Sequence, residues 1–338
     1  MVYVLESLDE EKQCAGDYGL TDSGVTSRIA SGFRKARRRA FQEDLRCIIL
    51  KCPPNLLPFN AVQESLHLTH YFYRDLQSVP LDSIVGSVGR YHDFTRHFWP
   101  RQDALRERWE RIARLMMRGG GLPPVHLYRV DEVYFVKDGN HRVSVARYLG
   151  ASVIKAYVWE FHTRVPLPLN TRPEALPLKE ELVSFLEHTD LDRVRPQQQI
   201  AFTVPGSYRP LEEHISAHRY WLENRHSKAV TVTEAVGSWY DLVYTPVAEI
   251  IRERNLLRYF PHSTETDLYL GILNTHQYLV QSLKRPVSLD QAIESYVDHF
   301  SPDPRRRVLC LLRHWLQGER RSQPALPAVA ASAPADGP

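Results

Sequence analysis

The chain is short of the residues and runs that several protein classes require. Its 338 residues include four cysteines, Cys14, Cys47, Cys52 and Cys310, with no CxxC pair and no Cys/His spacing of the zinc type. This pattern predicts neither a disulfide framework nor a metal site built from protein ligands. Free cysteines at such spacing fit a reducing compartment, and we expect a cytoplasmic protein.

Long apolar runs and a large charge imbalance are also missing. No apolar run approaches the roughly 20 residues that span a bilayer, and the start, "MVYVLESLDEEK", lacks a basic segment followed by an apolar one. We therefore expect no membrane partner. The formal net charge of +3 is too small to indicate a nucleic-acid binder by itself.

What the chain does have is enough apolar residues, 43%, for a real core. The spacing of apolar residues and the frequency of proline and glycine differ along the chain, and these differences indicate the boundaries of its segments. They predict a flexible arm (1–27), N-terminal helices (28–75), a compact α/β unit (76–162), a proline-rich linker (163–199), a helical domain (200–317) and a disordered tail (318–338).

The first strong pattern is an amphipathic helix with a basic outer face. Its apolar residues recur at helical spacing and are Phe33, Phe41, Leu45, Ile48 and Ile49. Between Arg28 and Lys51, eight Lys/Arg face only two acids, a local charge of +6. Such a run is either a solvated face or a surface for phosphates, so DNA is a candidate partner through Arg34–Arg39.

The α/β unit interleaves short strands with helices. A helix over 60–76 is followed by an extended segment, a helix over 103–118 that ends at "GGG", and strands in "PPVHLYRV", "VYFVKDG" and "SVIKAYVWEF". Between the last two strands, a helix is predicted from His141 to Leu149.

The turn between strand and helix, Asp138-Gly139-Asn140, places His141 and Arg142 at a helix start. A helix N-terminus exposes unpaired N–H groups and attracts anions, phosphate above all. Glycine lets the backbone come close to the anion, and arginine offers a planar fork to phosphate oxygens. The alternative is an ordinary turn with solvent-facing side chains.

A second glycine-containing segment precedes this turn in the same unit. In "GSVGR", Gly86 and Ser87 follow a strand and could wrap N–H groups around an anion to which Arg90 adds charge. No Gly-Lys-Ser/Thr follows, so this is not a Walker motif. A tight turn that needs two glycines explains the segment equally well.

Taken together, "VPLDSIVGSVGRYHDF" and "GGLPPVHLYRVDEVYFVKDGNHRVSVARYLGASVIKAYVWE" resemble the ParB/sulfiredoxin superfamily domain. The resemblance implies an α+β protein: a small mixed-sheet domain with a separate all-helical C-terminal domain. The C-terminal part resembles an uncharacterised bacterial helical module, which implies no activity, and it shows no ParB-type helix-turn-helix.

The resemblance also implies a role for the turn. In ParB proteins the turn holds the triphosphate of CTP, in free serine kinases Asp-Gly-His-His-Arg serves nucleotide phosphates, and in sulfiredoxins Gly-Gly-Cys-His-Arg carries the catalytic thiol. Here Asn140 stands at the thiol position. We therefore expect phosphate binding without sulfiredoxin chemistry.

The expected function is a ParB-like nucleoside triphosphate-binding protein, with slow hydrolysis as a regulatory switch and Mg²⁺ arriving with the nucleotide. His141 and Asp138 are the candidate catalytic residues. The candidate phosphate-binding residues are Gly139, Asn140, Arg142, Gly86, Ser87 and Arg90. The alternatives are a small-metabolite phosphotransferase resembling free serine kinases and a nucleic-acid-associated regulator, and an oligomer is compatible with either.

The turn generates a direct test of sulfur chemistry. Because Asn140 cannot attack a phosphoryl-activated sulfinate, the protein should not repair an overoxidised peroxiredoxin in an ATP-dependent assay. Repair that survives replacement of all four cysteines would contradict the assignment of this turn.

Overall fold

The computed structural model describes residues 22–53 and 55–302. The chain divides between Arg193 and Val194 into two compact units, which we describe separately. Most of the predicted arm, the predicted tail and the predicted helix in "DPRRRVLCLLRHWLQ" lie outside the described residues.

The N-terminal unit carries all the described strands and six helices in order along the chain. These elements are α1 (Asp22–Leu50), β1 (Leu57–Pro58), α2 (Phe59–Ser65), β2 (Tyr71–Pro80), β3 (Ile84–Ser87), α3 (Arg106–Met117), β4 (Val125–Val130), β5 (Val133–Asp138), α4 (Asn140–Tyr148), β6 (Val153–Phe161), α5 (Leu176–Thr189) and α6 (Leu191–Val194), which ends at the division. Short 3-10 helices cover Leu81–Ser83, Asp103–Leu105 and Pro173–Ala175.

The strands form one mixed sheet in the order β1-β3-β5-β4-β6-β2. The pairs β1/β3, β3/β5 and β4/β6 are parallel, whereas β5/β4 and β6/β2 are antiparallel. The β4/β5 hairpin pairs Val130 with Val133, and His126 with Asp138 at its open end. The chain leaves that open end of the hairpin directly into α4.

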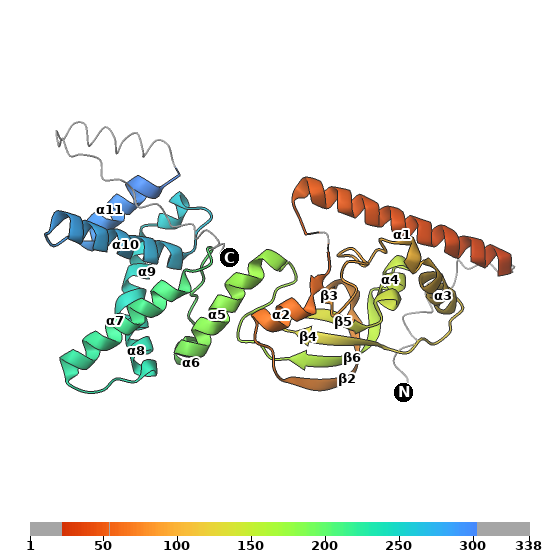
Figure 1. The fold of residues 1–338 in the computed structure, drawn as a ribbon, viewed down its shortest axis with the longest axis horizontal. Coiled ribbons are helices and arrows are strands. Elements are labelled where there is room, and N and C mark those ends of the chain that lie inside the picture. The colour runs from red at the N-terminus through yellow and green to blue at the C-terminus, as the bar shows by residue number, and fades with distance from the viewer. Residues whose placement is uncertain (1–21, 54, 303–338) are drawn as a thin grey trace, which may run out of the picture. The chain divides into compact units, whose positions relative to one another are not determined.

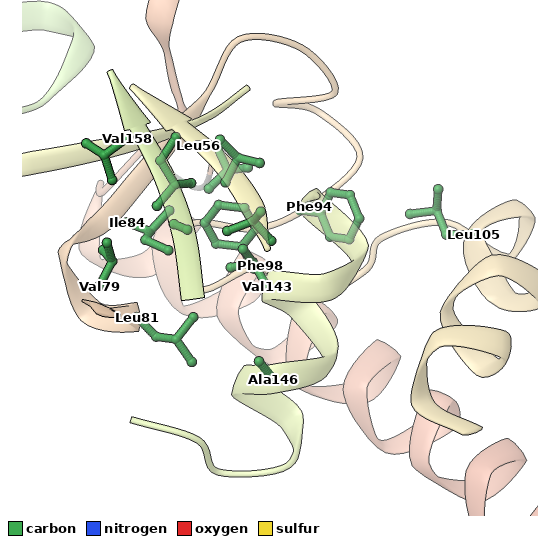
Figure 2. Close-up of a cluster of buried hydrophobic side chains, with 14 residues drawn as sticks. Leu56, Val79, Leu81, Ile84, Phe94, Phe98, Leu105, Val143, Ala146 and Val158 are labelled. Carbon is green, nitrogen blue, oxygen red and sulfur yellow. The ribbon is translucent and has the colours of Figure 1, made fainter. Parts of the chain in front are cut away.

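One face of the sheet is covered by helices in two successive layers (Figure 1). Apolar residues of α4, including Val143 and Ala146, join sheet residues such as Val158 in one buried cluster (Figure 2). On its other side α4 meets α1 and α3 in a second cluster that includes Phe33, Trp109 and Val145. Helix α4 is therefore the middle layer, buried from both sides.

The opposite face of the sheet is covered by α2. The ring of Phe59 packs against Tyr128, Phe135 and Phe161, with centroid distances of 4.7 to 5.4 Å. Helix α5 packs on α2 in turn. Residues 176–189 of the predicted linker thus belong to the N-terminal unit, and the helix there is longer than the short one expected around 179–186.

Two local predictions for this unit were wrong. The helix predicted over 60–76 ends at Ser65, and Tyr71–Pro80 is the edge strand β2, because the aromatic run there suits pairing with β6. In α1, Phe33 is buried, but the other four residues of the predicted apolar face are exposed. The small side chains of Ala36 and Ala40 form the inner face with Phe33 instead.

The described part of the C-terminal unit is helical. Its elements are α7 (Tyr208–His226), α8 (Val232–Trp239), a π-helical segment (Tyr240–Tyr244), α9 (Thr245–Glu253), a 3-10 helix (Leu256–Tyr259), α10 (Glu265–Leu283) and α11 (Leu289–Phe300). Rings of Trp239, Tyr244 and Tyr269 pack together in its core. The predicted capping box of Ser288 and Gln291 is confirmed at the start of α11. The protein is therefore α+β, with a mixed sheet followed by helices.

The close pairing of β1 and β3 generates a stability prediction at Gly86. A Cβ atom there would lie 2.2 Å from the Leu57 carbonyl oxygen and 2.5 Å from the Phe135 ring. We expect Gly86→Ala to lower the free energy of unfolding by about 1–3 kcal/mol in urea titrations. Gly89→Ala is the matched control, because its Cβ would meet nothing within 4 Å. Equal stability of the two variants would contradict this packing.

Candidate functional site

The site predicted from the sequence is built on the turn from β5 into α4. Gly139 takes the N-cap position with φ of 115° and ψ of 20°, a left-handed conformation that favours glycine. A Cβ atom at Gly139 would also lie 2.6 Å from the Val125 Cγ1 atom. The first N–H groups of α4 have no intrahelical acceptor and point out of the helix start.

His141 is the most unusual side chain of the turn. It is 4% exposed, and neither ring nitrogen has a hydrogen-bond partner. The imidazole lies edge-on to the Phe94 ring, with centroids 5.3 Å apart. A neutral imidazole carries one donor and one acceptor, and leaving both unpaired inside a protein is unfavourable.

Three arginines increase the positive potential at His141. Burial, as the largest cause, and the nearby charges of Arg108, Arg90 and Arg111, in that order, together lower the pKa of His141 to about 4. The imidazole is therefore neutral at pH 7, and the positive potential comes from the guanidinium groups. A negatively charged ligand would relieve their mutual repulsion.

Two of these arginines come from α3 and are free to meet a ligand. Arg108 and Arg111 are exposed on one flank of that helix, and in the described part of the chain neither forms an ion pair. The Trp109 Nε1–H group donates to the Ser144 hydroxyl at 3.0 Å and fixes α3 to α4. The basic flank of α3 is thus held beside the start of α4.

Arg90 lies on the loop after β3. Its backbone is left-handed, with φ of 58°, and its guanidinium is 3.6 Å from the Asp93 carboxylate. The side chain is about half exposed, so this ion pair is weak. Arg90 can therefore exchange Asp93 for an anionic ligand at low cost.

Arg142, the expected phosphate fork, is already engaged within the fold. Its Nη1 group donates to the carbonyl oxygens of Pro123 and Pro124 at 2.6 and 2.8 Å, and its Nη2 group donates to the Asp138 carboxylate. The structure thus uses Arg142 and Asp138 to fasten the turn to the segment before β4. A phosphate contact would have to share this guanidinium with those acceptors.

Gly86 and Ser87 lie inside β3 rather than on a loop, and both are buried. The Ser87 hydroxyl lies 3.0 Å from both the Val136 carbonyl and the Asn140 Oδ1 atom, and 2.5 Å from the Gly89 carbonyl. The single hydroxyl hydrogen of Ser87 can be donated to one of these three acceptors at a time, and the side chain lies between the loop after β3 and the turn. Asn140 is half-buried beside it.

A pocket of about 360 Å³ is lined in part by Arg142. Its lining is mostly apolar and includes Met116, Val125, Ala146 and Ile154, with Arg142 and Lys155 as its charged residues. A flat apolar group could enter there beside the turn.

The structure therefore gathers part of the predicted set and adds two residues. Gly139, Asn140, His141 and Arg90 meet at the start of α4, whereas Gly86, Ser87 and Arg142 support that arrangement from within. Sequence reasoning missed Arg108 and Arg111. Their spacing of three residues places them on one side of a helix, but only the packing of α3 on α4 brings that side to His141.

Burial of His141 predicts how stability depends on pH. The pKa of His141 in the folded state, about 4, lies below the ordinary histidine value of 6.5. Between those values the unfolded chain binds a proton that the folded chain does not, so the free energy of unfolding falls as pH falls. The slope from this one group is at most about 1.4 kcal/mol per pH unit.

Urea titrations at several pH values in this window should therefore show a weaker pH dependence for His141→Leu than for the wild type. His70→Gln is the control, because His70 is an exposed histidine of the same unit. Parallel curves for all three proteins would show that His141 is not held neutral.

No protein-family model matches the chain, and no curated protein matches it. Among solved structures, the chain is similar to the C2221 form of a Pnob8-like ParB-N domain at 12% identity, with a TM-score of 0.19. That match covers 72% of this chain and 99% of the other. A pNOB8-like ParB N-domain matches at 14% identity over 73% and 80% of the two chains, with a TM-score of 0.18. At such TM-scores the likeness carries no argument about family or function.

Proposed function

We propose that the N-terminal unit binds a nucleoside triphosphate, with its phosphates at the start of α4. The observation that carries this proposal is His141, buried with both ring nitrogens unpartnered at a helix N-terminus that three arginines face. A phosphate oxygen can accept from the imidazole N–H and from the free N–H groups of α4 at the same time.

The number of cations favours a polyphosphate over a single phosphate. Arg90, Arg108 and Arg111 come from two different segments, so their charges are spread around the helix start. A triphosphate carries several negative charges and can therefore accept from more than one guanidinium group. The resemblance of "DGNHR" to nucleotide-binding turns of the ParB/sulfiredoxin superfamily supports the same ligand class.

A magnesium ion would enter this site with the nucleotide. In the described residues no group of three or more His, Cys, Asp or Glu side chains is arranged to hold a metal. These residues therefore suit a magnesium ion that is held mainly by phosphates and water, with the Asn140 Oδ1 atom or the Asp93 carboxylate as a protein ligand. Bound there, the ion would neutralise charge on the phosphates.

The arrangement favours binding over phosphoryl transfer. A transferase needs a base beside the acceptor hydroxyl. Besides burial, the charged side chains that lower the pKa of His141 are all arginines, which stay protonated and cannot act as that base. The Asp138 carboxylate, the expected second catalytic group, accepts from Arg142. We therefore propose nucleotide binding as the primary activity, with slow hydrolysis resetting a regulatory state.

The two free arginines of α3 give the decisive test. We expect Arg108→Gln combined with Arg111→Gln to weaken nucleotide affinity roughly ten- to hundredfold, because charge-assisted contacts to phosphate are lost. Calorimetric titrations with ATP, CTP, GTP and UTP, with and without Mg²⁺, measure this change.

Arg209→Gln is the matched control, because Arg209 is an exposed arginine of α7 in the other unit. It should bind nucleotide as the wild type does. Wild type that binds none of the four nucleotides at millimolar concentration, or unchanged affinity in a folded double variant, would overturn the proposal.

A further inference from the structure

The outer side of α1 carries a continuous apolar stripe, formed by Phe41, Leu45, Ile48 and Ile49. Their exposed fractions are 68%, 49%, 74% and 72%. The opposite side of the helix is packed against α3 and α4 through Ile29, Phe33 and Ala36. Since the inner side is already used, the stripe is free to contact something outside this unit.

Basic residues lie on the same side of α1 as the stripe, closer to the N-terminus of the helix. Arg34, Arg38, Phe41, Leu45 and Ile48 follow one another at alternating steps of four and three residues, which places them on one side of an α-helix. Arg34 and Arg38 are exposed. A flat surface that meets the stripe therefore also meets these guanidinium groups.

The two acids in this part of α1 are turned away from that side. The Glu43 carboxylate accepts from the Thr95 hydroxyl at 2.8 Å and contacts the His97 ring nitrogen at 2.9 Å. The Asp44 carboxylate pairs with Arg101 at 2.7 Å. The exposed charged residues from Arg28 to Lys51 are all basic: Arg28, Arg34, Lys35, Arg38, Arg39, Arg46 and Lys51.

We propose that α1 docks this side on an anionic lipid membrane. A lipid interface accepts apolar side chains among its acyl chains and cations among its headgroup phosphates, and α1 offers both on one line. A DNA backbone would satisfy the cations but leave the stripe in water. A second copy packed in parallel on the stripe would bring the same cations against them.

The helix lies on the surface rather than crossing it. In the part of the chain that the structure describes, no helix is long and apolar enough to span a membrane. With its inner side fixed to α3, α1 presents the stripe without unfolding or rearranging the unit. This inference departs from the expectation, made from the sequence, of no membrane partner, and it does not depend on the nucleotide site.

Co-sedimentation of the full chain with vesicles tests the proposal. The wild type should sediment with vesicles that contain phosphatidylglycerol and much less with pure phosphatidylcholine vesicles. Two variants separate the contributions: a stripe variant with Phe41, Leu45, Ile48 and Ile49 each changed to Gln, and a basic variant with Arg34→Gln, Lys35→Gln and Arg38→Gln. Each should bind anionic vesicles at least roughly tenfold more weakly.

The control changes exposed aromatic residues elsewhere, Tyr220→Gln with Trp221→Gln on α7, and should bind as the wild type does. Because all the altered side chains are exposed, each variant should fold, and thermal melts check this.

Wild type that does not sediment with anionic vesicles, or a stripe variant that still does, overturns the proposal. A wild-type dimer that the stripe variant converts to a monomer in sedimentation velocity assigns the stripe to a second copy instead. DNA binding that the basic variant loses and the stripe variant keeps, without vesicle binding, assigns the cations to DNA.

Discussion

The left-handed backbone at Gly139 is the constraint on which the rest of the site depends. Strand β5 ends at Asp138 and α4 begins at Asn140, so the single residue between them must turn the chain back over the sheet. A side chain at that position would meet Val125 and resist the positive φ. Because glycine permits the turn, α4 lies as the middle layer, and its first residues are delivered to the edge of the core.

Helix α4 treats its two buried polar residues differently, and the difference indicates where a ligand belongs. Ser144 is fully buried, but it receives the Trp109 N–H group, so its burial stabilises the contact of α3 with α4. His141, three residues earlier, has no such partner. Helices that bury a polar group usually satisfy it. The imidazole at the open end of the helix is therefore the group that gains most from an incoming acceptor.

Short apolar runs, helical spacing and bounding glycines predicted several elements of the N-terminal unit. The strands of "PPVHLYRV" and "VYFVKDG" and the helices α3 and α4 were confirmed; the apolar residues of α3 recur at helical spacing, and α4 lies between Gly139 and Gly150. The inner face of α1 was predicted wrongly, because Phe41 and Leu45 are larger than the alanines that actually pack. The contribution of Arg108 could not be predicted, since it depends on tertiary packing that sequence spacing does not contain.

The net charge of the chain is small, but its charged residues are unevenly distributed between ion pairs and exposed basic surfaces. Three acids of the N-terminal unit pair with arginines of the same unit: Asp44 with Arg101, Asp138 with Arg142, and Asp82 with Arg147. The arginines that these acids neutralise are the more buried ones, which need a counter-charge most. Among the described residues, exposed cations lie together on the flank of α3, at Arg108 and Arg111, and on the outer side of α1, at Arg34 and Arg38. A total near zero is thus compatible with two anion-facing surfaces, because the two surfaces depend on the local arrangement of charge and not on its sum.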